Sequence, residues 1–222
     1  MALAVVKGRE VPAPSRPAAL TSERVLPVTG SLGELLPFGG LKRGTTTVVM
    51  AAPRPGVGEV PGATSLVIEI LAAASAGGGW SAVVGLPDLG LVAAGEGGVD
   101  LERLLLVPSP GGPDLEASVL ATLFDGVDLV AFAPGHRVSP ATGRKLAARV
   151  KERGSLLVVL ERRGRWGASP ADLRCTVTSS RWGGLGDGWG RLESLRVEVE
   201  VSGRGAAARP RQGELVLERH SA

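Results

Sequence analysis

Short apolar runs alternate with helical stretches along the middle of the chain, and this alternation limits the folds that the chain can adopt. Runs rich in Val and Leu occur at residues 45–50, 80–86, 103–108, 127–133 and 155–160. Helical patterns lie between them, over about 61–76, 113–124 and 139–153. Strands that are apolar along their whole length are typical of a parallel sheet covered on both faces. The sequence therefore predicts an α/β fold with a mostly parallel central sheet.

The pattern changes after residue 172. The segments 173–182, 192–202 and 214–219 are strand-like, and Arg196–Val201 alternates between polar and apolar residues, as a half-solvated strand does. These strands predict a C-terminal antiparallel β extension at one edge of the sheet.

Residues 1–20 contain Pro12, Pro14 and Pro17, which predict a flexible arm. An alternative is that this arm docks on a neighbouring subunit. Residues 21–222 are expected to form a single domain.

Composition excludes several classes of site. The 222 residues include one cysteine and two histidines, which excludes a disulfide framework and a His-rich or all-Cys metal site. The net charge of +3 is too small to establish nucleic-acid binding. The first residues contain no apolar run long enough for a signal peptide or a membrane span. The protein is expected in the cytoplasm, with association with the nucleoid left open and no membrane partner.

The loop after the first predicted strand resembles a phosphate-binding loop that has lost its key residue. Residues 51–65 are rich in glycine and lead into a helix, and Gly62, Ala63 and Thr64 occupy the places of Gly, Lys and Ser/Thr in the phosphate-loop motif. Ala63 supplies no charge for the β and γ phosphates. The degenerate loop is assigned the residues Gly56, Gly58, Gly62, Ala63, Thr64 and Ser65. Weak ATP or anion binding remains open, because a helix N-terminus favours anions.

The carboxylates expected of a nucleotide hydrolase are also missing. In phosphate-loop folds, a strand deep in the sheet is followed by an acidic residue that holds Mg²⁺. The matching strand here ends in Ala133, and Asp128 lies at its start. Asp88, after the second strand, is interpreted as a helix N-cap, with a carboxylate near the site as the alternative. The sequence thus predicts no catalytic residue, no bound metal and no cofactor, and favours a fold kept for binding.

Four segments, in this order, resemble the RecA-type ATPase core. They are 31–44 with its Gly39-Gly40-Leu41 turn, 62–66 at the end of the phosphate loop, 98–105, and 127–130 in the strand that carries the metal-side aspartate in that family. The resemblance covers about residues 28–220 and leaves out the C-terminal domain of RecA. It implies a RecA-like three-layer core in which Ala133 replaces the aspartate.

Within that superfamily the chain looks like ImuA-prime, because it is short and has lost both the lysine and the aspartate. This resemblance implies an accessory protein of the SOS response to DNA damage, active in mutagenic translesion synthesis. The implied partners are an ImuB-type polymerase-like protein and, indirectly, an error-prone C-family polymerase.

The resemblance also implies two DNA-binding loops, at 135–140 and 161–169. In the second loop, Arg162, Arg163 and Arg165 are candidates for phosphate contacts and Trp166 for stacking on a base of single-stranded DNA. Two alternatives stay open: a solvated loop whose Trp166 packs on the domain, and a hot spot for a protein partner. Trp182 and Trp189 flank a glycine-rich turn and mark either a partner surface or packing against the sheet.

Three functions are consistent with these features. The first is a non-catalytic adaptor. The second is a DNA-stimulated ATPase in which Arg54 or Lys42 replaces the missing lysine. The third is a protein that binds single-stranded DNA without nucleotide. His136 has no catalytic partner nearby in the sequence, and Cys175 is expected to be a buried, inert thiol.

Overall fold

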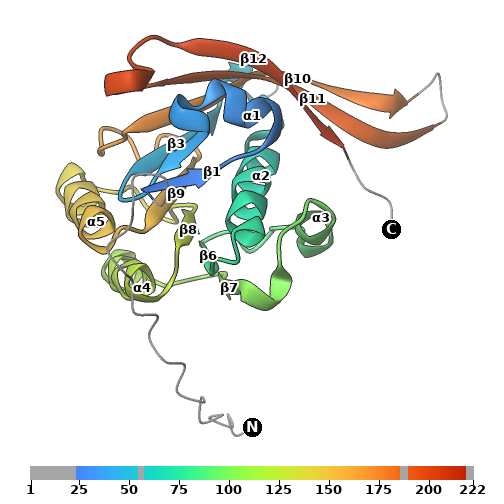
Figure 1. The fold of residues 1–222 in the computed structure, drawn as a ribbon. Coiled ribbons are helices and arrows are strands. Elements are labelled where there is room, and N and C mark those ends of the chain that lie inside the picture. The colour runs from blue at the N-terminus through green and yellow to red at the C-terminus, as the bar shows by residue number, and fades with distance from the viewer. Residues whose placement is uncertain (1–23, 55–57, 186–189, 219–222) are drawn as a thin grey trace, which may run out of the picture.

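An eight-stranded sheet runs through the computed structural model, which describes residues 24–54, 58–185 and 190–218 (Figure 1). The parallel strands are β3 (Thr46–Ala51), β6 (Ser81–Val84), β7 (Leu104–Val107), β8 (Leu129–Phe132), β9 (Leu156–Glu161) and β10 (Leu173–Leu185). Beyond β10, β11 (Gly190–Gly203) and β12 (Arg211–Glu218) pair antiparallel. The order across the sheet is β12-β11-β10-β3-β9-β8-β6-β7. The predicted fold class, a mostly parallel α/β sheet with a C-terminal antiparallel extension, is confirmed.

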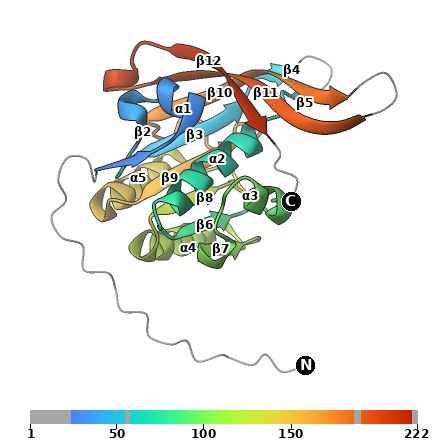
Figure 2. The same cartoon turned by 45° about the vertical axis from the view of Figure 1, so that its right-hand side comes forward.

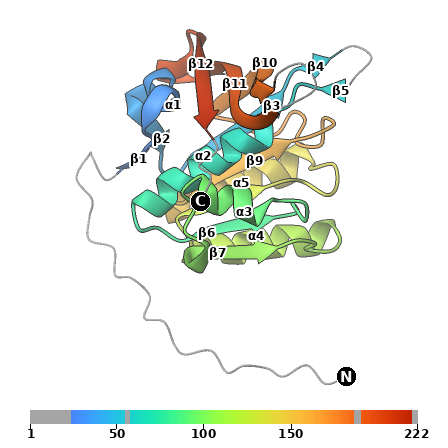
Figure 3. The same ribbon diagram turned by 90° about the vertical axis from the view of Figure 1, so that its right-hand side faces the viewer.

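Helices cover both faces of the sheet, as Figure 2 and Figure 3 show. One face carries α1 (Gly30–Leu35), α2 (Ala63–Ala76) and α3 (Leu91–Glu96), and the other carries α4 (Pro113–Gly126) and α5 (Pro140–Arg153). Short 3-10 turns lie at Pro37–Gly39, Leu101–Arg103 and Gly205–Ala207. In the described part of the chain, no helix combines the length and the apolar character needed to cross a membrane.

Neighbouring residues of the central strands pack into different cores. Val49 of β3 packs in the core under α2, together with Leu66 and Ile70. Val48, the preceding residue, packs on the other face with Phe124 of α4. Successive side chains of a strand point to opposite faces, so a strand covered on both sides must be apolar at every position. This explains why the predicted strands read as continuous apolar runs.

Helix α5 begins and ends where its sequence predicts. Ser139 is the N-cap, and its hydroxyl accepts a hydrogen bond from the backbone N–H of Thr142 at 3.1 Å. Pro140 occupies the first turn, where no N–H donor is needed. Gly154 follows the last turn in the left-handed conformation, with φ of 66°.

The C-terminal extension completes the core on the α2 face. Along β11, Val197 and Val199 are buried whereas Arg196 and Glu198 are exposed, which confirms the predicted alternation. Gly213 of β12 approaches α1 so closely that a Cβ there would lie 2.8 Å from Cδ2 of Leu35. The extension is therefore packed against the helices of this face along its buried side.

Several small elements differ from the sequence prediction. The sequence did not predict α1, the antiparallel pair of β1 (Val25–Pro27) and β2 (Gly40–Lys42), or the hairpin of β4 (Pro53–Arg54) and β5 (Gly58–Glu59). The prediction of Asp88 as an N-cap is wrong, because α3 begins at Leu91 and Gly90 is its N-cap. The predicted arm at 1–20 lies outside the described residues.

Candidate functional site

The carboxyl ends of the parallel strands bring together the loops in which the sequence predicts a nucleotide site. The loop from β3 to α2 carries the degenerate motif, and the turn after β6 carries Asp88. Ala133 follows β8, and Arg162 follows β9. Ligands of open α/β sheets bind at this edge. The edge is therefore the first place to look for nucleotide chemistry.

The segment after β3 is a β-hairpin over its described residues. Pro53 pairs with Glu59, and Arg54 pairs with Gly58, which has a φ of 110°. The backbone N–H of Val60 donates to the carbonyl of Ala52 at 3.0 Å. This donor is used within the protein, and a phosphate cradle needs free N–H groups that point at the ligand. Gly56 lies outside the described residues.

The last residues of the degenerate motif form the start of α2. Gly62 has a φ of 123°, and a Cβ there would lie 2.7 Å from Cγ1 of Val197. This glycine is thus required by packing on β11 and by its own backbone conformation. Ala63, Thr64 and Ser65 follow in the first turn of the helix, and all three are half-buried.

An arginine lies beside the motif threonine. Nη2 of Arg162 donates to Oγ1 of Thr64 at 3.3 Å, and its Nη1 lies 3.5 Å from Oδ2 of Asp88. The guanidinium therefore joins three loops, those that follow β3, β6 and β9. The sequence placed Arg162 in a DNA-binding loop and did not predict this bridge, because 98 residues separate it from Thr64.

Among the described residues, neither of the two cations proposed to replace the missing lysine forms a hydrogen bond with Thr64. Lys42 ends β2 and precedes β3, at the amino edge of the parallel sheet. Arg54 is exposed on the hairpin after β3. The prediction that Lys42 serves the degenerate loop is wrong, because the loop lies at the opposite end of β3 and Arg162 is the cation beside Thr64.

Comparison with known proteins identifies a family. The model of a domain described as the MT3502 N-terminal domain matches residues 34–167. This chain belongs to the MT3502 N-terminal domain family. It is also 36% identical, over 195 residues, to the uncharacterized protein Rv3395c of Mycobacterium tuberculosis. That alignment covers 85% of this chain and 89% of the relative.

The matched region of the MT3502 N-terminal domain family contains the candidate residues at the carboxyl edge. It includes α2 with Thr64, the turn with Asp88, Ala133 and the loop up to Gly167. The parallel strand β10 and the antiparallel strands β11 and β12 lie after it. The family match therefore covers five of the six parallel strands and all of these residues.

The strand that would carry a metal-side carboxylate ends in a closely packed alanine. The N–H of Ala133 donates to the carbonyl of Val84 at 2.9 Å. Gly85 has a φ of 75°, and a Cβ there would lie 2.2 Å from the carbonyl oxygen of Ala133. Among the described residues, no group of three His, Cys, Asp or Glu side chains is placed to hold a metal ion.

A buried glutamate organises the loop after β9. Glu161 is 8% exposed, and its carboxylate accepts backbone N–H bonds from Arg165 at 2.8 Å, Trp166 at 2.7 Å and Gly167 at 3.2 Å. Three charge-assisted bonds of this kind fix the course of a loop. The sequence did not single out Glu161, although an acidic residue at the end of an apolar strand is a usable signal.

Trp166 lies inside the protein. Its side chain is fully buried, its ring meets that of Phe132 edge-on with centroids 6.4 Å apart, and Nε1 donates to the carbonyl of Pro170 at 3.1 Å. The expectation that Trp166 stacks on a base is therefore corrected. Of the alternatives left open by the sequence, packing on the domain is the one observed, because the indole fills the core under α5.

The three arginines of this loop differ in their surroundings. Arg162 contacts Thr64, and Nη1 of Arg165 donates to the carbonyl of Pro134 at 2.8 Å. Arg163 is exposed and has a positive φ of 59°. Arg163 is the most accessible of the three for a partner or a phosphate.

The remaining candidates have structural roles. Nδ1 of His136 lies 3.5 Å from Oε2 of the buried Glu116. Burial raises the pKa of the Cys175 thiol to about 12, so the predicted inert thiol is confirmed. Trp182 is 37% exposed and lines a small pocket with Glu69, whereas Trp189 lies outside the described residues.

Proposed function

We propose that this chain is a non-catalytic RecA-like adaptor in DNA-damage-induced translesion synthesis. It binds an ImuB-type polymerase-like protein and, through it, an error-prone C-family polymerase. The proposal rests on the sequence resemblance together with the state of the carboxyl edge. The protein works in the cytoplasm, at the nucleoid when it engages damaged DNA.

The contacts of Arg162 with Thr64 and Asp88 are the observation that supports the proposed absence of catalysis. The Arg162 guanidinium lies between Thr64 and Asp88, at 3.3 and 3.5 Å. In active phosphate-loop enzymes the equivalent threonine hydroxyl holds Mg²⁺. A positive charge beside that hydroxyl disfavours Mg²⁺, and the Asp88 carboxylate in the site lies beside Arg162, while neither Ala63 nor Ala133 supplies a charged group. The edge thus favours a scaffold whose surfaces act without nucleotide hydrolysis.

The adaptor role is tested by pull-down of the full chain with the ImuB-type protein of the same genome. Specific association, resistant to nuclease treatment, is expected. A matched control is a Y-family polymerase from outside this system, which should not be retained. Absence of association with the ImuB-type protein would remove the adaptor proposal.

A DNA-stimulated ATPase is the second candidate, because Arg162 is a cation at the place where such an enzyme needs one. The two functions are separated by measuring ATP turnover with single-stranded DNA, for the wild type and for Arg162→Ala. The adaptor proposal expects background turnover in both, and no increase in Tm with Mg·ATP, since a ligand that binds the native state stabilises it. Turnover above background that Arg162→Ala abolishes would establish the ATPase instead.

A further inference from the structure

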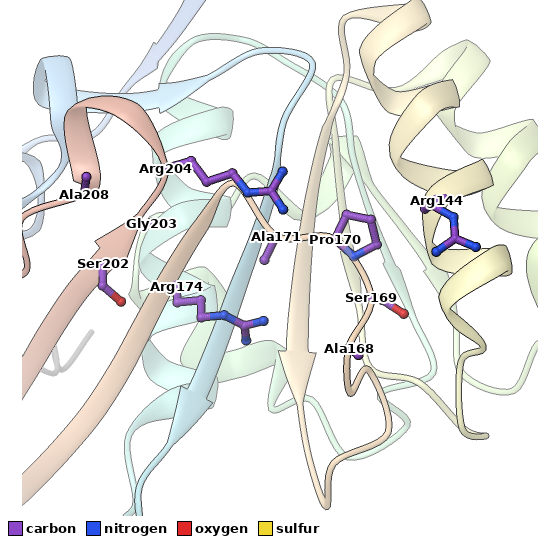
Figure 4. Close-up of a pocket in the computed structure, with 10 residues that line it drawn as sticks. All are labelled: Arg144, Ala168, Ser169, Pro170, Ala171, Arg174, Ser202, Gly203, Arg204 and Ala208. Carbon is purple, nitrogen blue, oxygen red and sulfur yellow. The ribbon is translucent and has the colours of Figure 1, made fainter.

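A pocket lined by three arginines lies beside α5, over the start of β10 and the end of β11 (Figure 4). Arg144 belongs to α5, Arg174 to β10, and Arg204 follows β11. The pocket has a volume of about 560 Å³, and no aspartate or glutamate lines it. Its size is in the range of ligand sites, and its charge is of one sign.

The pocket has two cationic walls. Arg174 and Arg204 extend their guanidinium groups toward the loop at 168–171, and Arg144 lies beyond Ser169 on the other side of that loop (Figure 4). The strand register pairs Arg174 with Ser202. Each arginine presents a planar fork of N–H donors that suits phosphate oxygens.

These arginines have no carboxylate partner in the part of the chain that the structure describes. Arg43, Arg149, Arg153 and Arg196 form close ion pairs with acidic residues, whereas the side chains of the three pocket arginines form none. The whole chain has nearly balanced charge, with 25 basic and 22 acidic residues. Three uncompensated arginines around one pocket repel each other, and an anion bound between them removes that cost.

Ser169 belongs to the loop that borders the pocket. It is 2% exposed, and its hydroxyl has no hydrogen-bond partner within the described structure. The hydroxyl packs against α5, because a Cβ at Gly143 would lie 2.5 Å from it, so it does not face the open pocket. The arginines therefore define the ligand chemistry of the pocket.

The cationic surface continues beyond the pocket. A second cavity of about 1020 Å³ shares Pro170 and Arg204 with the first. It follows the amino ends of the parallel strands, and its basic residues outnumber its acidic ones. The basic residues are Arg24, Lys42, Arg43, Lys151, Arg153 and Arg204, and the acidic ones are Asp128, Glu152 and Asp172. Of the basic residues, Arg43 and Arg153 are paired with Asp128 and Asp125. The two cavities together form a trough longer than one phosphate group needs.

We propose that this trough binds the backbone phosphates of a nucleic-acid strand, with one phosphate in the pocket beside Arg174 and Arg204. A chain of regularly spaced phosphates matches a long surface with an excess of positive charge better than a single small anion does. The residues that line the pocket include no aromatic side chain, so the strand is held by its backbone without base stacking. The trough lies at the amino edge of the sheet, opposite Arg162, so this inference stands apart from the proposed adaptor function.

The test is fluorescence anisotropy of the full chain with a labelled oligothymidylate, titrated over a range of salt concentrations. Each lost phosphate contact makes the slope of log K against log salt shallower by about 0.7. The double variant R174Q/R204Q should therefore show a slope shallower by about 0.7 and, at 0.1 M salt, an affinity about 5-fold lower. R204Q alone should show about half of the slope change. Because Arg204 is exposed, this single variant should fold as the wild type does, so it controls for a folding defect in the double variant.

Two matched controls use arginines outside the trough. R181Q removes an exposed arginine at the far end of β10, and R163Q removes the exposed arginine of the loop after β9. Both should bind as the wild type does. Equal affinity of R174Q/R204Q and the wild type, or a loss confined to R163Q, would overturn the proposal. Displacement of the strand by thymidine monophosphate at concentrations near the Kd of the strand would also overturn it, since the pocket would then take a free phosphate ligand.

Discussion

At the scale of single residues, Trp166 is the clearest case of a side chain whose role depends on its surroundings. Its indole is fully buried and packs against Phe132 in the core under α5. Trp166→Ala should therefore destabilise the protein by about 3–5 kcal/mol, the usual cost of emptying a buried aromatic site. The measurement is urea denaturation followed by circular dichroism.

The control for this prediction is Trp80→Ala, because the Trp80 side chain is 42% exposed. Its effect should be much smaller. A Trp166→Ala variant as stable as the wild type would mean that the loop after β9 does not hold the indole in the core.

Glu69 on α2 provides a second prediction at this scale. Burial raises the pKa of this carboxyl, so the folded protein binds the proton more tightly than the unfolded chain does. Stability from this group is present at low pH and is lost as pH rises through the shifted pKa. Glu69→Gln should therefore raise Tm at pH 8 and have little effect at pH 4. Glu59→Gln, at an exposed position, should show no such pH-dependent difference.

At the scale of elements, the parallel strands and the long helices could be predicted because local patterns determine them. The caps Ser139 and Gly154 and the apolar strand at 156–161 each act over a few residues. The hairpin of β4 and β5 could not be predicted, since strands of two residues carry no periodic pattern. Asp88 was misassigned because its partner is Arg162, a contact that only tertiary structure creates.

The same distinction explains the candidate site. The sequence shows directly that alanine stands at position 63, where the phosphate-loop motif has lysine, and at position 133, where the resemblance places an aspartate. The Arg162 bridge and the Glu161 anchor require loops that are distant in sequence to meet at one edge. Burial of Trp166 likewise depends on Phe132, on another strand. Residue identity alone shows these alanines, whereas the fold was needed to find the contacts of Arg162, Glu161 and Trp166.

Gly62, at the start of α2, leads to a prediction about the stability of this element. Gly62→Ala should destabilise the protein by more than about 1 kcal/mol, because its φ is 123° and a Cβ would lie 2.7 Å from Val197. Gly126→Ala is the matched control, since no atom lies within 4 Å of a Cβ there and alanine favours a helix. Thermal unfolding of both variants tests this prediction. Equal Tm values would show that neither packing nor backbone conformation requires glycine at position 62.

At the scale of the whole molecule, the C-terminal extension and the parallel core share one hydrophobic interior. Strand β10 pairs directly with β3, and Cys175 and Val177 of β10 lie in the same cluster as Leu66 and Ile70 of α2. Val197 and Val199 of β11 extend that cluster. The apolar area that covers α2 is thus divided between the family-matched region and the strands after it.

This shared interior predicts that the chain unfolds as one cooperative unit and that the matched region does not fold without the extension. A variant that ends at Asp172 would expose one flank of β3 and the apolar face of α2, and should be aggregated or unfolded by circular dichroism. For the full chain, urea transitions measured by tryptophan fluorescence and by circular dichroism should coincide, since Trp166 lies in the loop after β9 and Trp182 lies in β10. Two separate transitions, or a soluble truncated chain with a cooperative melt, would show instead that the parallel core is an independent domain to which β10, β11 and β12 are merely appended.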